Sequence, residues 1–141
     1  MQLGVLAYYY LLGDPDSTYL TFFGGYEPGT AWTRHWCPAV AFDVGRPTGK
    51  WSVLATDRDP AANDLTYKVY QRSYENALIL YKPLSHTRAA KTVPTADDST
   101  ATRHDLGATY QPLQADGTLG SPITSISLRN GEGAVLAKVK Q

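Results

Sequence analysis

The sequence predicts a mainly β domain of the α+β class: a small antiparallel β-sandwich, or a curled antiparallel sheet, preceded by a helix–strand–helix segment. Residues 66–83 have the pattern of two strands joined at Glu75-Asn76 and stopped by Lys82-Pro83. From there to the C-terminus, turn signals recur about every 8–12 residues, which is typical of small antiparallel sheets. The first sixty residues lack this spacing and indicate a different kind of structure.

The apolar run at residues 3–12 predicts a short helix, because a helix that is apolar all round is normally buried on several sides. Gly13 suits a C-terminal cap, and Pro15 prevents continuation. A tyrosine-rich strand is the alternative for the same run. The run is shorter than the roughly 20 residues that span a bilayer, and it lacks the basic region and cleavage site of a signal peptide. We therefore expect it to be part of the fold.

The rest of the N-terminal segment has mixed signals. Residues 18–23 are β-branched and aromatic, and they predict a buried strand. Residues 32–43 are predicted to be helical in part, with Pro38 in the first turn of a helix that begins near Cys37. Residues 51–65 are predicted to form a connector that contains a turn cluster.

Beyond the hairpin, the same local signals predict a series of strands. Gly107 is expected to mark a β-bulge or a close approach within the first of them. Asn130-Gly131 is a typical hairpin-type turn before the last strand. The strands are predicted at residues 102–110, 123–128 and 134–139.

The charge balance limits the classes of partner. Lysine plus arginine and aspartate plus glutamate both number 13, so the formal net charge is zero. Nucleic acid is therefore not an expected partner, because there is no basic excess to displace counterions from phosphates. An electrostatic role at a membrane surface is not expected for the same reason.

No cofactor or metal is expected. Cys37 is the only cysteine, so neither an intramolecular disulfide nor a cysteine-based metal site can form within the chain. His35, His86 and His104 are too scattered to indicate a metal triad, and no glycine-rich phosphate loop is present. The sequence leaves the cellular compartment open.

Several short motifs carry a family resemblance. The hairpin contains RxYENxLILxxP at residues 72–83, and it is followed by HDLGATY at 104–110, ISL at 126–128 and GAVL at 133–136. This order resembles the C-terminal β-domain attached to many (β/α)-barrel glycoside hydrolases, although Ala77 stands where those proteins often have glycine. Residues 1–60 resemble the end of such a barrel, and residues 61–141 resemble the appended β-sandwich domain.

The resemblance implies a non-catalytic C-terminal β-domain of a carbohydrate-active protein, with a structural or accessory role. The parent protein would be the glycoside hydrolase, and Arg72 and the hairpin tyrosines would pack rather than react. An autonomous carbohydrate-binding module is one alternative. An oligomerisation or interaction protein is another, because an apolar N-terminal segment without its barrel needs a cover. The expected partners are carbohydrate, a second copy of the chain, or a missing barrel domain.

Five residues are candidates for carbohydrate binding. Tyr26, Trp32, His35 and Trp36 are predicted to form a sugar-stacking cluster, although helix-to-sheet packing is the preferred role of Trp36. Glu27 follows the proposed last barrel strand, at the end where barrel active sites lie. Because glycoside hydrolysis uses two carboxyl groups and Glu27 has no evident partner, a plain loop role is favoured and no catalytic residue is assigned.

Overall fold

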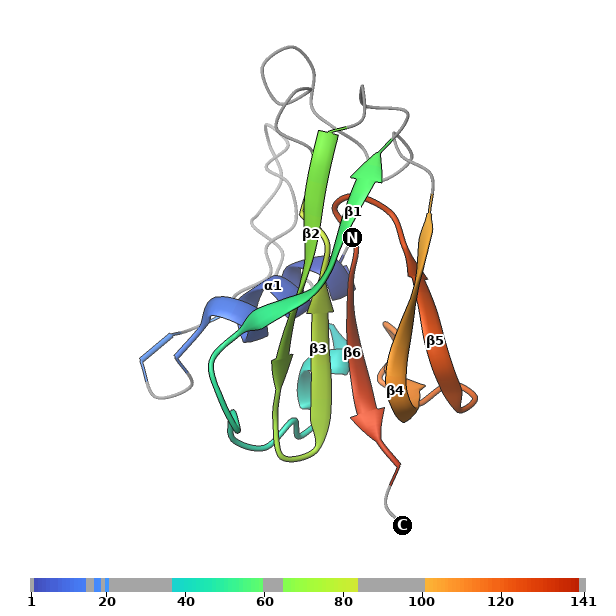
Figure 1. The fold of residues 1–141 in the computed structure, drawn as a ribbon. Coiled ribbons are helices and arrows are strands. Elements are labelled where there is room, and N and C mark those ends of the chain that lie inside the picture. Colours follow the sequence, from blue (N-terminus) through green and yellow to red (C-terminus); the bar gives the residue numbers. More distant parts are fainter. Residues whose placement is uncertain are drawn as a thin grey trace, which may run out of the picture.

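The structure, a computed structural model, describes residues 2–14, 17–18, 20, 37–59, 65–83 and 101–139. Within these residues the chain forms one α-helix, one short 3₁₀ helix and six antiparallel strands in a single curled sheet, a half-barrel with the α-helix against it (Figure 1). The mainly β, α+β prediction is confirmed, and the curled sheet is the arrangement found. No helix in the described ranges is long and apolar enough to cross a membrane.

Most element boundaries agree with the sequence pattern. The helix predicted at residues 3–12 is present, so the alternative of a tyrosine-rich strand is excluded. The elements are α1 (Gln2–Leu12), the short 3₁₀ helix η1 (Pro38–Ala41), β1 (Ser52–Asp59), β2 (Leu65–Ser73), β3 (Ala77–Tyr81), β4 (Thr102–Pro112), β5 (Ile123–Leu128) and β6 (Gly133–Lys138). The strand order across the sheet is β1-β2-β3-β6-β4-β5.

The β2–β3 hairpin turns where the sequence predicts. Tyr74 donates its backbone N–H to the carbonyl of Ala77 at 2.8 Å, which leaves Glu75 and Asn76 as the loop residues. The loop is also tied to the segment after η1, because Asn76 donates its backbone N–H to the carbonyl of Val44 at 3.0 Å. The hairpin therefore anchors the segment after η1 as well as the sheet.

The prediction of a connector at residues 51–65 is wrong for most of that segment. Residues 52–59 form β1, which pairs antiparallel with β2 and contains an irregularity between Val53 and Ala55. The charged residues at 57–59 have low strand propensity, so the sequence pattern there does not indicate a strand. In the folded chain, β2 supplies the backbone hydrogen-bond partners that make this segment a strand. β1 ends before the predicted domain boundary at residue 61, and its pairing partner β2 begins after that boundary.

The segment at residues 32–43 was predicted to be partly helical, and its described part contains a single 3₁₀ turn with Pro38 at its start. Pro38 occupies the first turn as expected, but the turn ends before Phe42 and no regular α-helix follows. A short turn of this kind is common in connecting segments. The strand predicted at residues 18–23 falls mainly outside the described residues.

Both faces of the sheet are buried, each by its own cluster. On one face, Leu6 and Ala7 of α1 pack with Ile79 and Val135. On the concave face, side chains from strands near both edges of the sheet pack together, including Val69, Leu106 and Leu128. The central strands β3 and β6 are consequently buried on both sides, whereas β1 and β5 lie at the edges.

Two glycines shape the sheet. Gly107 has φ of 71°, a conformation that L-residues with side chains rarely adopt, and the register of β4 against β5 shifts between Asp105 and Tyr110. The predicted bulge is thus confirmed. Gly133 lies under the helix, where a Cβ atom would stand 2.6 Å from the Cβ of Ala7. The missing side chain at Gly133 lets α1 approach β6 closely.

Candidate functional site

The five residues predicted to bind carbohydrate are outside the described part of the chain. Tyr26, Glu27, Trp32, His35 and Trp36 all fall within residues 21–36. Their role in sugar binding stays a prediction. The described residues instead offer an exposed aromatic surface and a crevice lined by tyrosines.

An aromatic row crosses the helix-side face of the sheet. Val53 is directly opposite Tyr70, and Tyr70 is directly opposite Tyr81, so the three side chains share one face. Trp51 precedes Val53 by two residues, and its ring meets that of Tyr70 edge-on at 5.5 Å between centroids. Tyr81 contacts Tyr8 of α1 at 5.3 Å. We call the four aromatic residues of this row, Tyr8, Trp51, Tyr70 and Tyr81, the aromatic band.

The two ends of the aromatic band are open to solvent. Trp51 and Tyr8 are each 50% exposed, and the two tyrosines between them are partly buried. Burial raises the pKa of Tyr81, and the neighbouring Tyr8 raises it further. The ring planes are inclined by 79° between Trp51 and Tyr70 and by 58° between Tyr8 and Tyr81. Neither pair of rings therefore forms a flat platform for a ligand.

Helix α1 also presents an apolar stripe to solvent. Val5, Tyr8 and Leu12 are 44%, 50% and 51% exposed, and their spacing places them on one side of the helix. We call these three residues the α1 stripe. The opposite side of the helix is buried through Leu6, Ala7 and Leu11. Since α1 carries no charged residue, its exposed side is compatible with contact to another apolar surface.

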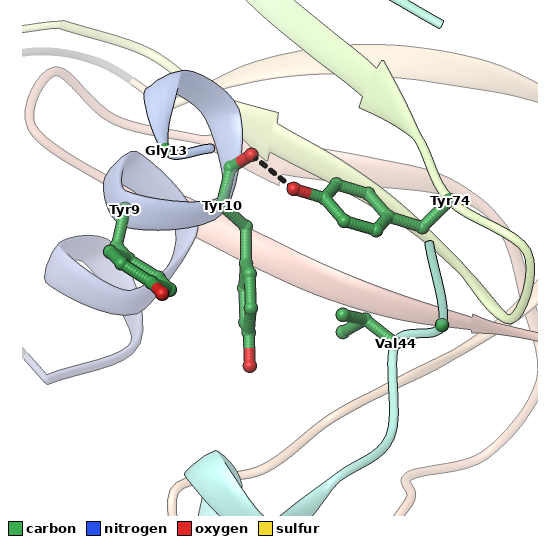
Figure 2. A pocket seen from close by; sticks show the side chains of 6 residues that line it. Tyr9, Tyr10, Gly13, Val44 and Tyr74 are labelled. Carbon is green, nitrogen blue, oxygen red and sulfur yellow. Dashed lines mark hydrogen bonds between the residues drawn. The ribbon is translucent and has the colours of Figure 1, made fainter. Parts of the chain in front are cut away.

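A small crevice lies between the C-terminal end of α1 and the start of the hairpin loop (Figure 2). Its volume is about 40 Å³. Tyr74 donates its hydroxyl to the carbonyl of Tyr10 at 2.7 Å, and Tyr9 donates its hydroxyl to the carbonyl of Thr18 at 2.7 Å. We call this site the tyrosine crevice. It is lined by Tyr9, Tyr10, Gly13, Val44, Gly45 and Tyr74.

Two of the tyrosines that line the crevice, Tyr10 and Tyr74, have raised pKa values. The pKa of Tyr10 is raised, first by burial and then by the nearby Tyr9, Tyr74, Asp43 and Cys37. Burial also raises the pKa of Tyr74, and the guanidinium of Arg72 opposes part of that effect. Both hydroxyls thus stay protonated to a higher pH than a free tyrosine.

Arg72 closes the C-terminal end of α1. Its Nη1 donates to the carbonyls of Tyr10, Leu11 and Gly13 at 3.2, 3.3 and 2.8 Å. Its Nε donates to the carbonyl of Gly49 at 3.2 Å. Helix-end carbonyls need such partners, and α1 has no basic residue of its own in its last turn. These contacts agree with the predicted packing role of Arg72, but its three helix carbonyls could not be identified from the sequence.

Lys82 is a buried, hydrogen-bonded side chain. The sequence predicted Lys82-Pro83 only as the end of a strand, so this role was missed. The side chain is fully buried, and Nζ donates to Thr102 Oγ1 and to the carbonyl of Leu128, both at 3.1 Å. Thr102 Oγ1 is in turn 2.9 Å from Nε2 of His104. This group joins the segment after β3 to β4 and β5, so its geometry is that of a structural tie.

Four carboxylates in the described ranges support turns or loops. Each accepts at least one backbone N–H from a turn or loop, and Thr118 also donates its hydroxyl to one of them. The pairs, acceptor first, are Asp43 with Gly45, Glu75 with Arg46, Asp116 with Thr118 and Glu132 with Arg129. No group of three histidine, cysteine or carboxylate residues that could hold a metal occurs among the residues that the structure describes.

Comparison with known proteins finds no family model, no curated protein and no solved structure that matches this chain. The resemblance to glycoside-hydrolase β-domains therefore depends on the sequence motifs alone. Function has to be argued from the surfaces of the molecule.

Proposed function

We propose that this chain is a non-catalytic accessory β-domain of a carbohydrate-active protein and that it contacts carbohydrate through the aromatic band. The observation that carries the proposal is the half-exposed indole of Trp51, held edge-on by Tyr70. The hairpin motif at residues 72–83 supports the association with carbohydrate-active proteins.

The chemistry of the aromatic band suits a sugar ligand. A tryptophan ring combines a large apolar face with one hydrogen-bond donor, and it can therefore stack on the C–H face of a pyranose while its edge stays in water. Trp51 lies at the start of edge strand β1, where a long ligand could approach without displacing another strand. Tyr8, at the other end of the band, offers a second exposed ring.

The non-catalytic role that we propose is supported by what four of the described carboxylates do. Hydrolysis of a glycosidic bond usually needs two carboxyl groups facing each other across the bond. Asp43, Glu75, Asp116 and Glu132 each accept a backbone N–H within a turn or loop instead. We therefore assign bond cleavage to another part of the parent protein.

Calorimetric titration with a panel of soluble oligosaccharides tests the proposal. We expect binding heat from the wild-type chain and from Leu119→Ala, which removes an exposed apolar side chain outside the band. We expect no heat from Trp51→Ala. Absence of heat from the wild-type chain across the panel would refute the carbohydrate role, and turnover of an aryl glycoside that survives repurification would refute the non-catalytic role.

A second candidate function is protein docking through the α1 stripe. Val5, Tyr8 and Leu12 form an exposed, uncharged side of a helix, the kind of surface that apolar interfaces use. The partner would be a barrel domain or a second copy of the chain. Sedimentation of the wild-type chain and of Leu12→Lys separates these possibilities, since self-association that Leu12→Lys abolishes indicates a second copy. A wild-type monomer at all concentrations excludes self-association.

A further inference from the structure

The tyrosine crevice has the construction of an aromatic cage. The rings of Tyr9 and Tyr10 lie 5.2 Å apart at 58°, and those of Tyr10 and Tyr74 lie 5.8 Å apart at 68°. All three rings line the crevice, and Figure 2 shows the ring of Tyr10 between those of Tyr9 and Tyr74. Val44 adds an apolar wall.

We propose that the tyrosine crevice binds a compact organic cation of the quaternary ammonium class. The face of an aromatic ring carries negative potential and attracts a cation within about 6 Å of its centroid. A methylated ammonium group spreads its charge over several methyl groups, so it can contact more than one ring at a time. This proposal is independent of the carbohydrate role, because it concerns a different surface.

The size of the crevice fits such a head group. A cavity needs roughly 10–15 Å³ to admit one water molecule, and the tyrosine crevice measures about 40 Å³. It therefore has room for a cluster of a few methyl-sized groups but not for a large ligand. The remainder of the ligand would extend into solvent.

The hydroxyl groups of the cage favour an organic cation over a metal ion. Tyr9 and Tyr74 both donate their hydroxyls to backbone carbonyls, of Thr18 and Tyr10 respectively. These two tyrosines consequently offer ring carbons to the crevice. A small inorganic cation would lose its hydration shell here without gaining enough oxygen ligands, whereas a quaternary ammonium group is weakly hydrated and pays little for entry.

The surrounding charges are compatible with a bound cation. The guanidinium of Arg72 lies 5.5 Å from the centroid of the Tyr74 ring, a cation–π geometry, so this ring already accommodates one positive group. Arg72 does not line the crevice, and its guanidinium donates to four backbone carbonyls. The carboxylate of Asp43 adds negative potential at Tyr10, where it helps to raise the pKa of the hydroxyl.

The test compares choline with 3,3-dimethylbutan-1-ol, a neutral molecule of the same shape, by NMR titration of the wild-type chain. We expect saturable shifts of the crevice tyrosine resonances and binding of choline about tenfold tighter than that of the neutral molecule. Equal affinity for the two would show an apolar crevice without cation recognition, and no saturable binding of choline would overturn the proposal outright. Both decisions need only the wild-type protein.

Variants then locate the site. We expect Tyr9→Leu to weaken choline binding at least about fivefold and Tyr9→Phe to retain it, because phenylalanine keeps the ring face. Leu119→Ala, at an exposed apolar side chain outside the crevice, is the control and should bind choline like the wild type. Urea unfolding of each variant confirms that it is folded. A folded Tyr9→Leu protein with unchanged affinity, or a loss of affinity in Leu119→Ala, would contradict this location.

Discussion

At the residue scale, the C-terminal end of α1 is completed by side chains that are distant in sequence. Arg72 and Tyr74 point to the same side of the sheet because side chains alternate along an extended chain. Arg72 reaches three carbonyls at the helix end, and Tyr74 shares one of them, that of Tyr10. These contacts fix the helix to the hairpin, and they place Tyr10 and Tyr74 around the tyrosine crevice.

Replacement of Arg72 tests the contribution of these contacts to stability. We expect Arg72→Met to lower the free energy of unfolding by about 1–3 kcal/mol, because partly buried helix carbonyls lose a charged donor. Arg103→Met is the matched control, since Arg103 is exposed on β4 and should change stability by less than about 0.5 kcal/mol. Urea unfolding followed by circular dichroism measures both. Equal effects of the two substitutions would show that Arg72 does not support the helix end.

The acidity of the tyrosines predicts a loss of stability at high pH. Tyr10, Tyr74 and Tyr81 have folded-state pKa values above the ordinary value of 10.0. Above that pH the unfolded chain ionises first and unfolding releases protons, so the contribution of these groups is fully present below pH 10 and is lost as the pH rises through their folded pKa values. Urea unfolding between about pH 8.5 and 11 should show a constant free energy followed by a decline.

The matched comparison for this pH effect is the double variant Tyr10→Phe/Tyr74→Phe. It should decline less steeply above pH 10, because two of the shifted groups no longer titrate. An identical decline in the variant would mean that other groups cause the loss of stability. Absorbance of tyrosinate in the folded protein provides an independent check on the direction of the shifts.

At the element scale, the position of α1 depends on small residues beneath it. Gly133 at the start of β6 leaves no space for a side chain, because a Cβ would stand 2.6 Å from Ala7 and 3.1 Å from the carbonyl of Leu80. The helix backbone also approaches the turn that precedes β6, since a Cβ at Gly4 would be 3.2 Å from the carbonyl of Gly131. Close contact brings Tyr8 onto Tyr81 and so joins the helix to the aromatic band.

A glycine pair tests this contact. We expect Gly133→Ala to lower the free energy of unfolding by about 1–3 kcal/mol, because the added methyl group forces α1 away from β6. Gly49→Ala is the control, since a Cβ there would meet no atom within 4 Å and its φ is not in the left-handed region. It should be neutral or slightly stabilising. Denaturant midpoints compare the two, and a neutral Gly133→Ala would show that the helix can shift without cost.

At the scale of the whole molecule, curling lets one sheet bury both of its faces. The helix and the η1 segment cover one face, and the concave face is filled by one cluster with side chains from all six strands. Within the described residues, one six-stranded sheet thereby forms two hydrophobic clusters. The edge strand β1 remains accessible, and with it Trp51 of the aromatic band.

Two neighbouring residues of β3 test this arrangement. Ile79 belongs to the helix-side cluster and Leu80 to the concave cluster, and both are fully buried. We expect Ile79→Ala and Leu80→Ala each to cost about 2–5 kcal/mol of unfolding free energy. Leu119→Ala, at an exposed leucine, should cost far less. A small effect at Leu80 alone would show that the concave face is not a packed core.

Local chemistry made much of the fold predictable. The apolar run of α1, the loop at Glu75-Asn76 and the bulge at Gly107 each depend on residues that are neighbours in the chain. The strands at 102–110, 123–128 and 134–139 were predictable for the same reason. Strand β1 was missed, because its charged end resembles a turn until β2 supplies a pairing partner.

The sequence by itself therefore determined the antiparallel, mainly β class and most of its elements. Only the tertiary structure decided the insertion of β6 between β3 and β4 and the union of Tyr8, Trp51, Tyr70 and Tyr81 in one band. The tyrosine crevice likewise joins α1 to residues more than thirty positions away. Propensity acts between neighbours along the chain, whereas these surfaces arise from strand register and helix docking, which bring distant residues together.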